Sequence, residues 1–234
     1  MSFMGTFCKS GQRFCALAII LGLIFLYKAE ATKEFICVTK EIFRDEENEV
    51  SGKIALTFDD GPHPIYTPEL LEGLKERGVV ATFFVTGANA SLYPELIEQM
   101  EKDGHVVGNH TYHHVQLSSV GEKIFLQELH ETNRVLEGIL EEEVSYVRPP
   151  FGDWSKSLEE EIDMLPVLWD VDPLDWCSGN TDQIVKKVVD HVEDNSIVLL
   201  HDEYATSVEA AFEIIDRLKA EGYEFVTVEH ILLK

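Results

Sequence analysis

The sequence predicts an α/β fold in which parallel strands and helices alternate around a closed or nearly closed barrel. Short apolar and β-branched runs, typical of buried strands, alternate with longer segments whose apolar residues recur at helical spacing. About seven such units follow one another without an internal repeat or a low-complexity stretch. Strands connected by helices run parallel, and this number of units favours a barrel over an open sheet.

The expected elements follow directly from this alternation. Glycines 78 and 104 mark the ends of two of the expected helices. Strands are expected at residues 54–58, 79–85, from 106 onward, 144–147, 165–171, 196–200 and 224–228. Helices are expected at residues 68–77, 93–103, 122–140, 181–192 and 208–220.

The first 31 residues have the pattern of an export leader. Lys9 and Arg13 precede an unbroken apolar run at 14–27, and small residues follow at 29–31. A membrane-spanning helix needs about 20 apolar residues, so we favour a signal peptide (1–31) over a signal anchor. Either interpretation places the remaining chain outside the cytoplasmic membrane, in the cell envelope or the extracellular space, with membrane contact only through the leader.

Residues 32–50 are expected to be a connector, with at most one edge strand near Phe35–Val38, before a single catalytic domain at 51–234. The hydrophobic fraction of 45% fits one globular core plus an extension. The formal net charge of -24 argues against nucleic acid or an anionic membrane surface as a partner. We expect a monomer.

Of the four cysteines, only Cys37 and Cys177 lie beyond the leader. Their separation does not match the spacing of metal ligands, and a disulfide between them stays open. Both are expected to be small buried residues.

Two adjacent carboxylates, Asp59 and Asp60, end the first expected strand and precede Gly61-Pro62. Neighbouring side chains on a strand point to opposite faces, so both aspartates reach one site only if the chain turns there. Gly-Pro supplies such a turn. Taken alone, the motif would be an ordinary Asx turn.

His110 and His114 follow the third strand and are four residues apart. On one helical turn both rings would face the same side, as two ligands of one metal ion would. Thr111 stands where a zinc-protease motif has its glutamate base, so a base must come from elsewhere. The aspartate pair offers that base and a third ligand, and His113 would point away.

Three further polar clusters come directly after expected strands. Arg148 is held by two prolines before Phe151, Asp175-Trp176 follows the strand at 165–171, and His201 ends the strand at 196–200. In a parallel barrel the site collects at the carboxyl ends of the strands. These clusters are therefore expected to converge with the aspartates and histidines.

In this order the motifs resemble those of the polysaccharide deacetylase family, the NodB-like carbohydrate esterases of family four. The matching segments are Thr57–Pro62, Ala81–Gly87, His110–His114, Arg148–Gly152, Asp175-Trp176 and Leu199–His201. The resemblance implies a distorted (β/α)7 barrel of parallel strands.

The resemblance also implies residue roles. Asp60, His110 and His114 correspond to ligands of one divalent metal ion, usually zinc, with cobalt or another ion in some members. Asp59 corresponds to the general base and Arg148 to its partner.

On the other side of the site, the resemblance makes His201 the catalytic acid and Asp175 the residue that tunes the pKa of this histidine. Trp176 and Leu199 would line the pocket for the acetyl methyl group. The Phe151 amide would stabilise the oxyanion, and phenylalanine stands here where many members have tyrosine.

The implied reaction is metal-dependent hydrolysis of N-acetyl groups from amino sugars of a polysaccharide, with release of acetate. Peptidoglycan is the favoured glycan substrate, and chitin oligosaccharides and O-acetylated xylan are alternatives. A metal-containing saccharide-binding protein without turnover belongs to a different class, and we favour it less because every motif residue is present.

Overall fold

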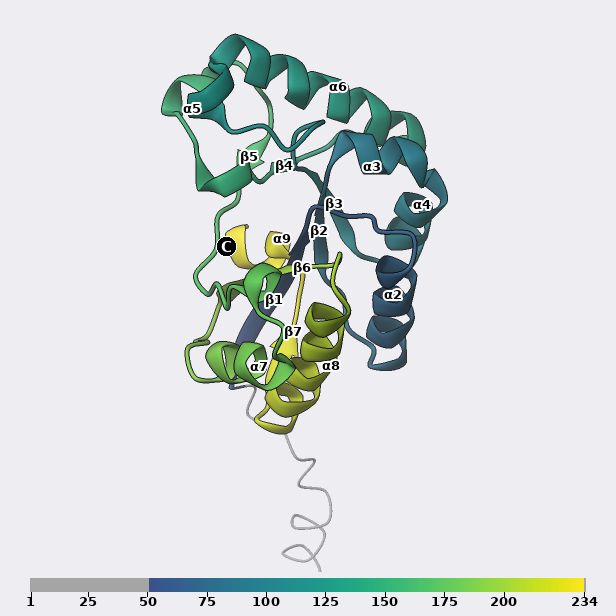
Figure 1. Ribbon diagram of the computed structural model, residues 1–234, viewed down its shortest axis with the longest axis vertical. Coiled ribbons are helices and arrows are strands. Elements are labelled where there is room, and N and C mark those ends of the chain that lie inside the picture. Colours follow the sequence, from purple (N-terminus) through teal and green to yellow (C-terminus); the bar gives the residue numbers. More distant parts are fainter. Residues whose placement is uncertain (1–50, 234) are drawn as a thin grey trace, which may run out of the picture. The chain divides into compact units, whose positions relative to one another are not determined.

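The computed structural model describes residues 51–233, in which seven parallel strands form one curled sheet with helices packed against it (Figure 1). Every strand pairing in this region is parallel. The strands are β1 (Gly52–Asp59), β2 (Thr82–Val85), β3 (Val106–Asn109), β4 (Tyr146–Val147), β5 (Leu165–Pro166), β6 (Ser196–His201) and β7 (Tyr223–Phe225). The predicted α/β class and parallel arrangement are confirmed.

The sheet order is β5-β4-β3-β2-β1-β6, and β7 pairs with the first half of β1. Between β5 and β6 the described chain has only one bridge, from Val171 to Val198. The strand expected at 165–171 is thus reduced to two residues and this bridge. The result is a distorted (β/α)7 barrel that is incompletely closed at this point.

Strand β1 shows how side-chain alternation sorts the core from the site. Its residues Ile54, Leu56 and Phe58 belong to the large apolar cluster that includes residues of the surrounding helices. Ala55 belongs to a second, smaller cluster on the other face of the sheet. Asp59 lies four residues after Ala55 and therefore points to the same face of the sheet as this second cluster.

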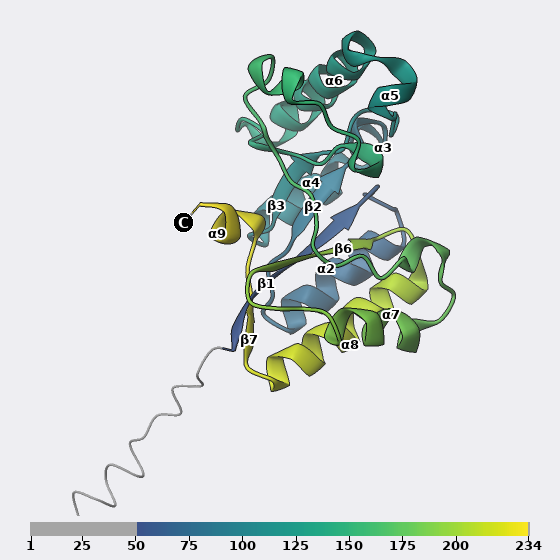
Figure 2. The ribbon, with the colours of Figure 1, turned by 90° about the vertical axis from the view of Figure 1, so that its left-hand side faces the viewer.

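The helices occupy both sides of the sheet. Helices α2, α7 and α8 lie together on one side, and the short α9 lies on the other (Figure 2). Their bounds are α2 Tyr66–Glu76, α3 Gly87–Leu92, α4 Pro94–Lys102, α5 Leu117–Val120, α6 Glu122–Leu140, α7 Thr181–Val189, α8 Ala205–Ala220 and α9 Val228–Leu232. Short 3-10 segments cover Pro150–Gly152, Lys156–Glu160 and Asp175–Cys177.

The last expected strand, at 224–228, is wrong at its end. The strand stops at Phe225, and Val228 begins α9 instead. Val228 is fully buried and belongs to the second, smaller apolar cluster with Ala55 and Ile197. The chain therefore leaves the sheet and covers this cluster with a helix.

The leader (1–31), the connector (32–50) and Cys37 lie outside the described residues. Within residues 51–233, no helix combines the length and the apolar character needed to cross a membrane. Cys177 is exposed, which corrects the expectation of a buried thiol. It lies in a surface 3-10 turn next to Trp176, where no strand or helix covers it.

Candidate active site

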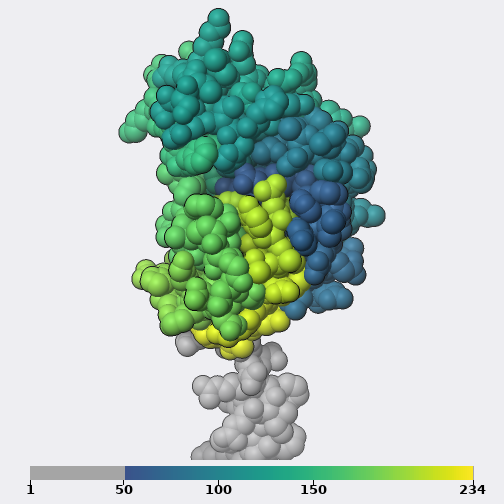
Figure 3. Space-filling model, in the orientation of Figure 1, coloured from purple at the N-terminus to yellow at the C-terminus, as the bar shows by residue number. Residues whose placement is uncertain are grey.

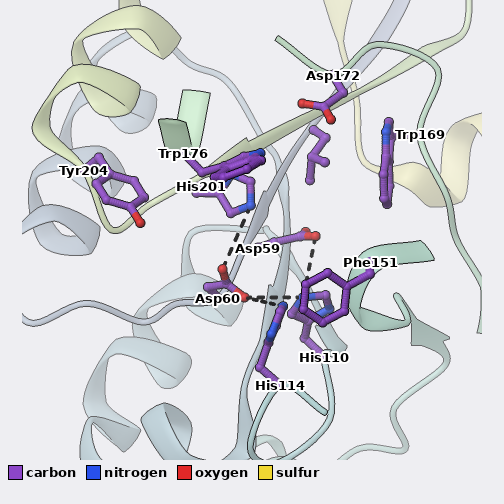
Figure 4. Close-up of a pocket in the computed structure, with 11 residues that line it drawn as sticks. Asp59, Asp60, His110, His114, Phe151, Trp169, Asp172, Trp176, His201 and Tyr204 are labelled. Atoms are coloured by element: carbon purple, nitrogen blue, oxygen red, sulfur yellow. Dashed lines mark ion pairs between the residues drawn. The ribbon is translucent and has the colours of Figure 1, made fainter. Parts of the chain in front are cut away.

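A cavity of about 420 Å³ opens at the carboxyl ends of the strands (Figure 4). Segments from the beginning, middle and end of the described chain meet on the face of the molecule shown in Figure 3. The cavity is lined by Asp59, Asp60, His110, His114, Phe151, Trp169, Asp172, Trp176, Leu199, His201 and Tyr204. Eight of the ten residues proposed from the sequence line the cavity. The other two each bond to a lining residue, Asp175 to His201 and Arg148 to Asp59.

The two aspartates reach one cavity because the chain turns at Asp60 itself. Asp59 is the last residue of β1, and Asp60 has a left-handed backbone with φ of 76°. The turn is fixed by the Asn89 side-chain amide, which donates to the Asp60 carbonyl at 2.8 Å. Gly61 is required next, because a Cβ there would lie 2.3 Å from the Asp202 carboxylate.

Asp60, His110 and His114 bring three ligand atoms together (Figure 4). The Asp60 Oδ1 lies 3.4 Å from His110 Nε2 and 3.3 Å from His114 Nε2. Ligands about 2.0–2.1 Å from a tetrahedral zinc ion would be about 3.3 Å apart, so these separations fit such an ion. The same oxygen is buried and has no hydrogen-bond partner within the described chain, which is expected of an atom that serves as a cation ligand.

The orientation of His110 supports the same interpretation. Its Nδ1 lies 2.7 Å from the Arg148 carbonyl oxygen, which can only accept, so Nδ1 carries the proton. The Nε2 lone pair is then left facing Asp60. Oxygen and imidazole ligands suit zinc or cobalt.

The two histidines do not share a helical turn, which corrects the expectation from their spacing. They lie on an irregular loop in which Thr111 and His114 have positive φ angles of 61° and 54°. The Asn109 side chain accepts from the Thr111 N–H at 2.8 Å and so shapes the turn. His113 points away from the cavity as expected, and its ring lies 2.9 Å from Glu128.

Asp59 is paired with a buried arginine. The Arg148 guanidinium has no exposed surface and donates to Asp59 Oδ1 at 2.8 Å. It also donates to the Thr57 hydroxyl at 2.6 Å and to the carbonyl oxygens of Val167 and Leu168. Because a buried charge is stable only when it is paired and hydrogen-bonded, this network fixes the Asp59 carboxylate in place.

The opposite wall holds a histidine and its carboxylate. His201 Nδ1 lies 2.8 Å from Asp175 Oδ1, and the second Asp175 oxygen accepts from the His201 backbone N–H. Burial alone would lower the pKa of His201, but the hydrogen bond and charge of Asp175, with the charges of Asp59 and Asp60, raise it to about 9. A divalent cation bound by Asp60 would lower this pKa, because like charges repel.

Aromatic and apolar side chains form the rest of the cavity. Trp176 and Phe151 are 53% and 66% exposed, whereas Leu199, which also lines the cavity, is buried. Phe151 has a left-handed backbone and stands edge-on to the His114 ring.

Three lining residues were not assigned from the sequence: Trp169, Asp172 and Tyr204. Each lies just after a strand or bridge, so the same strand-end rule could have found them. No spacing pattern distinguishes them from ordinary loop residues.

Comparison with known proteins agrees with this geometry. The family model described as polysaccharide deacetylase matches residues 46–167. The peptidoglycan-N-acetylmuramic acid deacetylase PdaC of Bacillus subtilis is 40% identical over 198 residues, which are 85% of this chain and 42% of that protein. A peptidoglycan-N-acetylglucosamine deacetylase of Bacillus cereus is 35% identical over 184 residues, 76% of this chain and 67% of the relative. The chain thus spans less than half the length of PdaC.

Solved structures show the same fold. The structure of Bacillus subtilis PdaC superposes with a TM-score of 0.75 at 41% identity, covering 77% of this chain and 90% of that one. A family 4 acetyl xylan esterase from Clostridium thermocellum, in complex with a cobalt ion, gives 0.72 at 31% identity, with coverage of 77% and 90%. By its sequence, its fold and the residues at its strand ends, the chain belongs to the polysaccharide deacetylase family.

Proposed function

We propose that this chain hydrolyses N-acetyl groups of amino sugars in a polysaccharide, and that peptidoglycan is its substrate. The observation that carries the proposal is the convergence of three units on one cavity. These are the cation triad around Asp60, the Asp59–Arg148 pair and the His201–Asp175 pair. Hydrolysis of an amide needs an activated water, a base and an acid, and this cavity offers a candidate for each.

Asp60, His110 and His114 would hold one divalent cation, for which we propose zinc, with cobalt as a functional substitute. When bound, the cation would polarise the acetamide oxygen and make a water molecule more acidic. The buried, unpartnered Asp60 oxygen and the proton position on His110 support this assignment.

Asp59 would accept the proton of the attacking water. Its carboxylate faces the cavity and is held by Arg148, so it does not have to reorganise during the reaction. The Phe151 backbone N–H would donate to the developing oxyanion.

His201 would donate a proton from Nε2 to the leaving nitrogen. An amine leaves poorly unless it is protonated, and Asp175 favours the protonated ring. Trp176 and Leu199 would enclose the acetyl methyl group, because both present apolar surface in the cavity.

The names of the relatives support a cell-wall substrate, and the expected leader supports export to the envelope or beyond. The large negative charge argues against nucleic acid as a partner. We propose a monomer that contacts the membrane only through its N-terminal segment.

Acetate release from the purified full-length chain tests the proposal. The protein is stripped with a chelator, reloaded with zinc or cobalt, and offered peptidoglycan, chitin oligosaccharides and acetylxylan in parallel. We expect metal-dependent release from peptidoglycan. Release from another polymer alone would move the substrate assignment, and metal binding without any release would favour a saccharide-binding protein.

A further inference from the structure

The loop that carries His110 and His114 has a backbone that needs support. Thr111 and His114 are both left-handed, although each has a Cβ that makes this conformation unfavourable. No helix or strand includes the loop. Its shape must therefore be held by contacts with the elements around it.

Helix α3 binds the carbonyl oxygens of the loop. The first backbone N–H groups of α3, from Gly87 and Ala88, donate to the carbonyls of Thr111 and Tyr112 at 3.0 and 3.1 Å. Gly87 allows this approach, because a Cβ there would come within 2.4 Å of the Tyr112 ring.

Helix α6 binds the backbone N–H groups of the same loop. One oxygen of the Glu128 carboxylate accepts from the backbone N–H of Tyr112 at 3.0 Å and of His113 at 2.7 Å. The other oxygen lies 2.9 Å from the His113 ring nitrogen Nδ1. The Glu128 side chain is only 13% exposed, so these bonds form in a partly dry environment where a carboxylate acceptor is strong.

The same helix also anchors the start of the loop. The Asn109 side chain donates to the Leu129 carbonyl and the Asn133 side chain of α6, at 2.8 and 2.7 Å. Asn109 then accepts from Thr111. Glu128 is the one charged group on α6 that binds the segment between the two histidines in the described structure.

We propose that Glu128 is a positioning residue that sets the affinity of the site for its divalent cation. It does not touch the cation triad itself. It fixes the two amides between the ligands, and so keeps the His110 and His114 nitrogens at the separations from Asp60 described above. This inference rests on the proposed function, because that function requires a cation at the triad.

Zinc affinity of the full-length chain tests the inference. Dissociation constants are measured by chelator competition for the unaltered protein, Glu128→Ala, Glu128→Gln and the control Glu137→Ala, an exposed residue of the same helix. Loss of a partner that orients ligands weakens metal binding by about 10–100-fold, and we expect this for Glu128→Ala. Glu128→Gln should lie between, since its amide oxygen can still accept from both N–H groups, and Glu137→Ala should be unchanged.

The visible absorption spectrum of the cobalt-loaded proteins gives a second readout. A loosened ligand set should change the band shape in Glu128→Ala and not in Glu137→Ala. His113→Ala removes the contact between the ring and Glu128 but leaves the hydrogen bonds from both backbone N–H groups. This variant should therefore bind zinc almost normally. If Glu128→Ala does not fold, as judged by circular dichroism, Glu128→Gln and His113→Ala carry the comparison.

Equal zinc affinity in all folded Glu128 variants would overturn the positioning role, even if their thermal stability falls. Failure of the unaltered protein to bind zinc or cobalt would instead refute the proposed function. The two failures are thus distinguishable.

Discussion

Asp59 and Asp60 are neighbours in the chain but have opposite surroundings. The Asp59 carboxylate is paired with a fully buried guanidinium, whereas one oxygen of Asp60 is buried without a partner. The left-handed turn at Asp60 produces this division, because it gives two consecutive carboxylates different neighbours.

The division predicts the behaviour of Asp59→Asn. Turnover should fall by about 10²–10⁴-fold, because the asparagine cannot accept a proton. Zinc should still bind, since the Asp59 carboxylate is not one of the three ligand groups and lies 3.8 Å from His110 Nε2, farther than the Asp60 carboxylate at 3.4 Å. Acetate release and chelator competition on the same sample check both statements, with the exposed Asp163→Asn as control. Loss of zinc in parallel with loss of turnover would show that the two aspartates share one role.

Asp175→Asn should change the pH profile. In its proposed role as the acid, His201 must be protonated, so activity is present below its pKa and is lost as the pH rises through it. Burial lowers this pKa and Asp175 raises it. Removing the carboxylate should therefore shift the alkaline limb of kcat/KM to lower pH by about 1–3 units. A lower rate with an unmoved alkaline limb would assign the acid role to another group.

Residue identities at the site were predictable because each short motif carries its own chemistry and follows a strand. The backbone angles of Asp60, Thr111 and His114 were not, since a positive φ is uncommon for any residue other than glycine, even for the aspartate and histidine that adopt it more often than most. Two bonding partners were also missed from the sequence: Thr57, which accepts from Arg148, and Glu128, which accepts from the loop that carries His110 and His114. These contacts arise only when distant segments pack together.

At the scale of elements, the alternation of strands and helices was predicted correctly, and so were both ends of the helix at 122–140, but several other ends were not. The expected strand at 79–85 begins only at Thr82, because the Val79 N–H still donates to the Leu74 carbonyl of α2 and the Ala81 N–H donates to the His105 ring. The short helices α3, α5 and α9 were not expected. Helices of four to six residues offer too few turns for a helical period to be recognised.

Strand β3 predicts a strong effect of one methyl group. A Cβ on Gly108 would lie 2.7 Å from the Phe84 ring and 3.1 Å from the Tyr146 carbonyl. The Phe84 ring lies 4.2 Å from the Arg148 guanidinium, so its displacement would also disturb the partner of Asp59. Gly108→Ala should lower the free energy of unfolding by about 1–3 kcal/mol and reduce turnover.

Urea denaturation measures this effect, with Gly138→Ala as the matched control. Gly138 lies on helix α6 with nothing within 4 Å of the added methyl group, so alanine there should stabilise the protein by up to about 1 kcal/mol. Equal stability of both variants would mean that β3 and its neighbours move apart easily.

At the scale of the whole molecule, the cation triad connects the end of β1 to the loop after β3, across the intervening β2. A cation that binds only the folded state stabilises it by about 2.7 kcal/mol at 100 times its dissociation constant. For a chain of this size we expect chelation to lower Tm by about 5–10 °C. Thermal scans with and without zinc measure this shift, and His114→Ala should not respond to zinc. A Tm that does not depend on the metal in the unaltered protein would contradict a cation site at the triad.

The pairing of β1 with β6 also determines when this site can first exist during folding. The Thr57 hydroxyl of β1 bonds to a carbonyl 141 positions later in the chain, on the strand that ends at His201. Such distant contacts form slowly, because a long loop must close before they stabilise anything. His201, the proposed acid, therefore reaches the aspartates only when the last third of the chain has joined the sheet. If the proposed deacetylation is correct, an incompletely folded chain cannot remove acetyl groups, and the onset of acetate release during refolding would time the closure of the barrel.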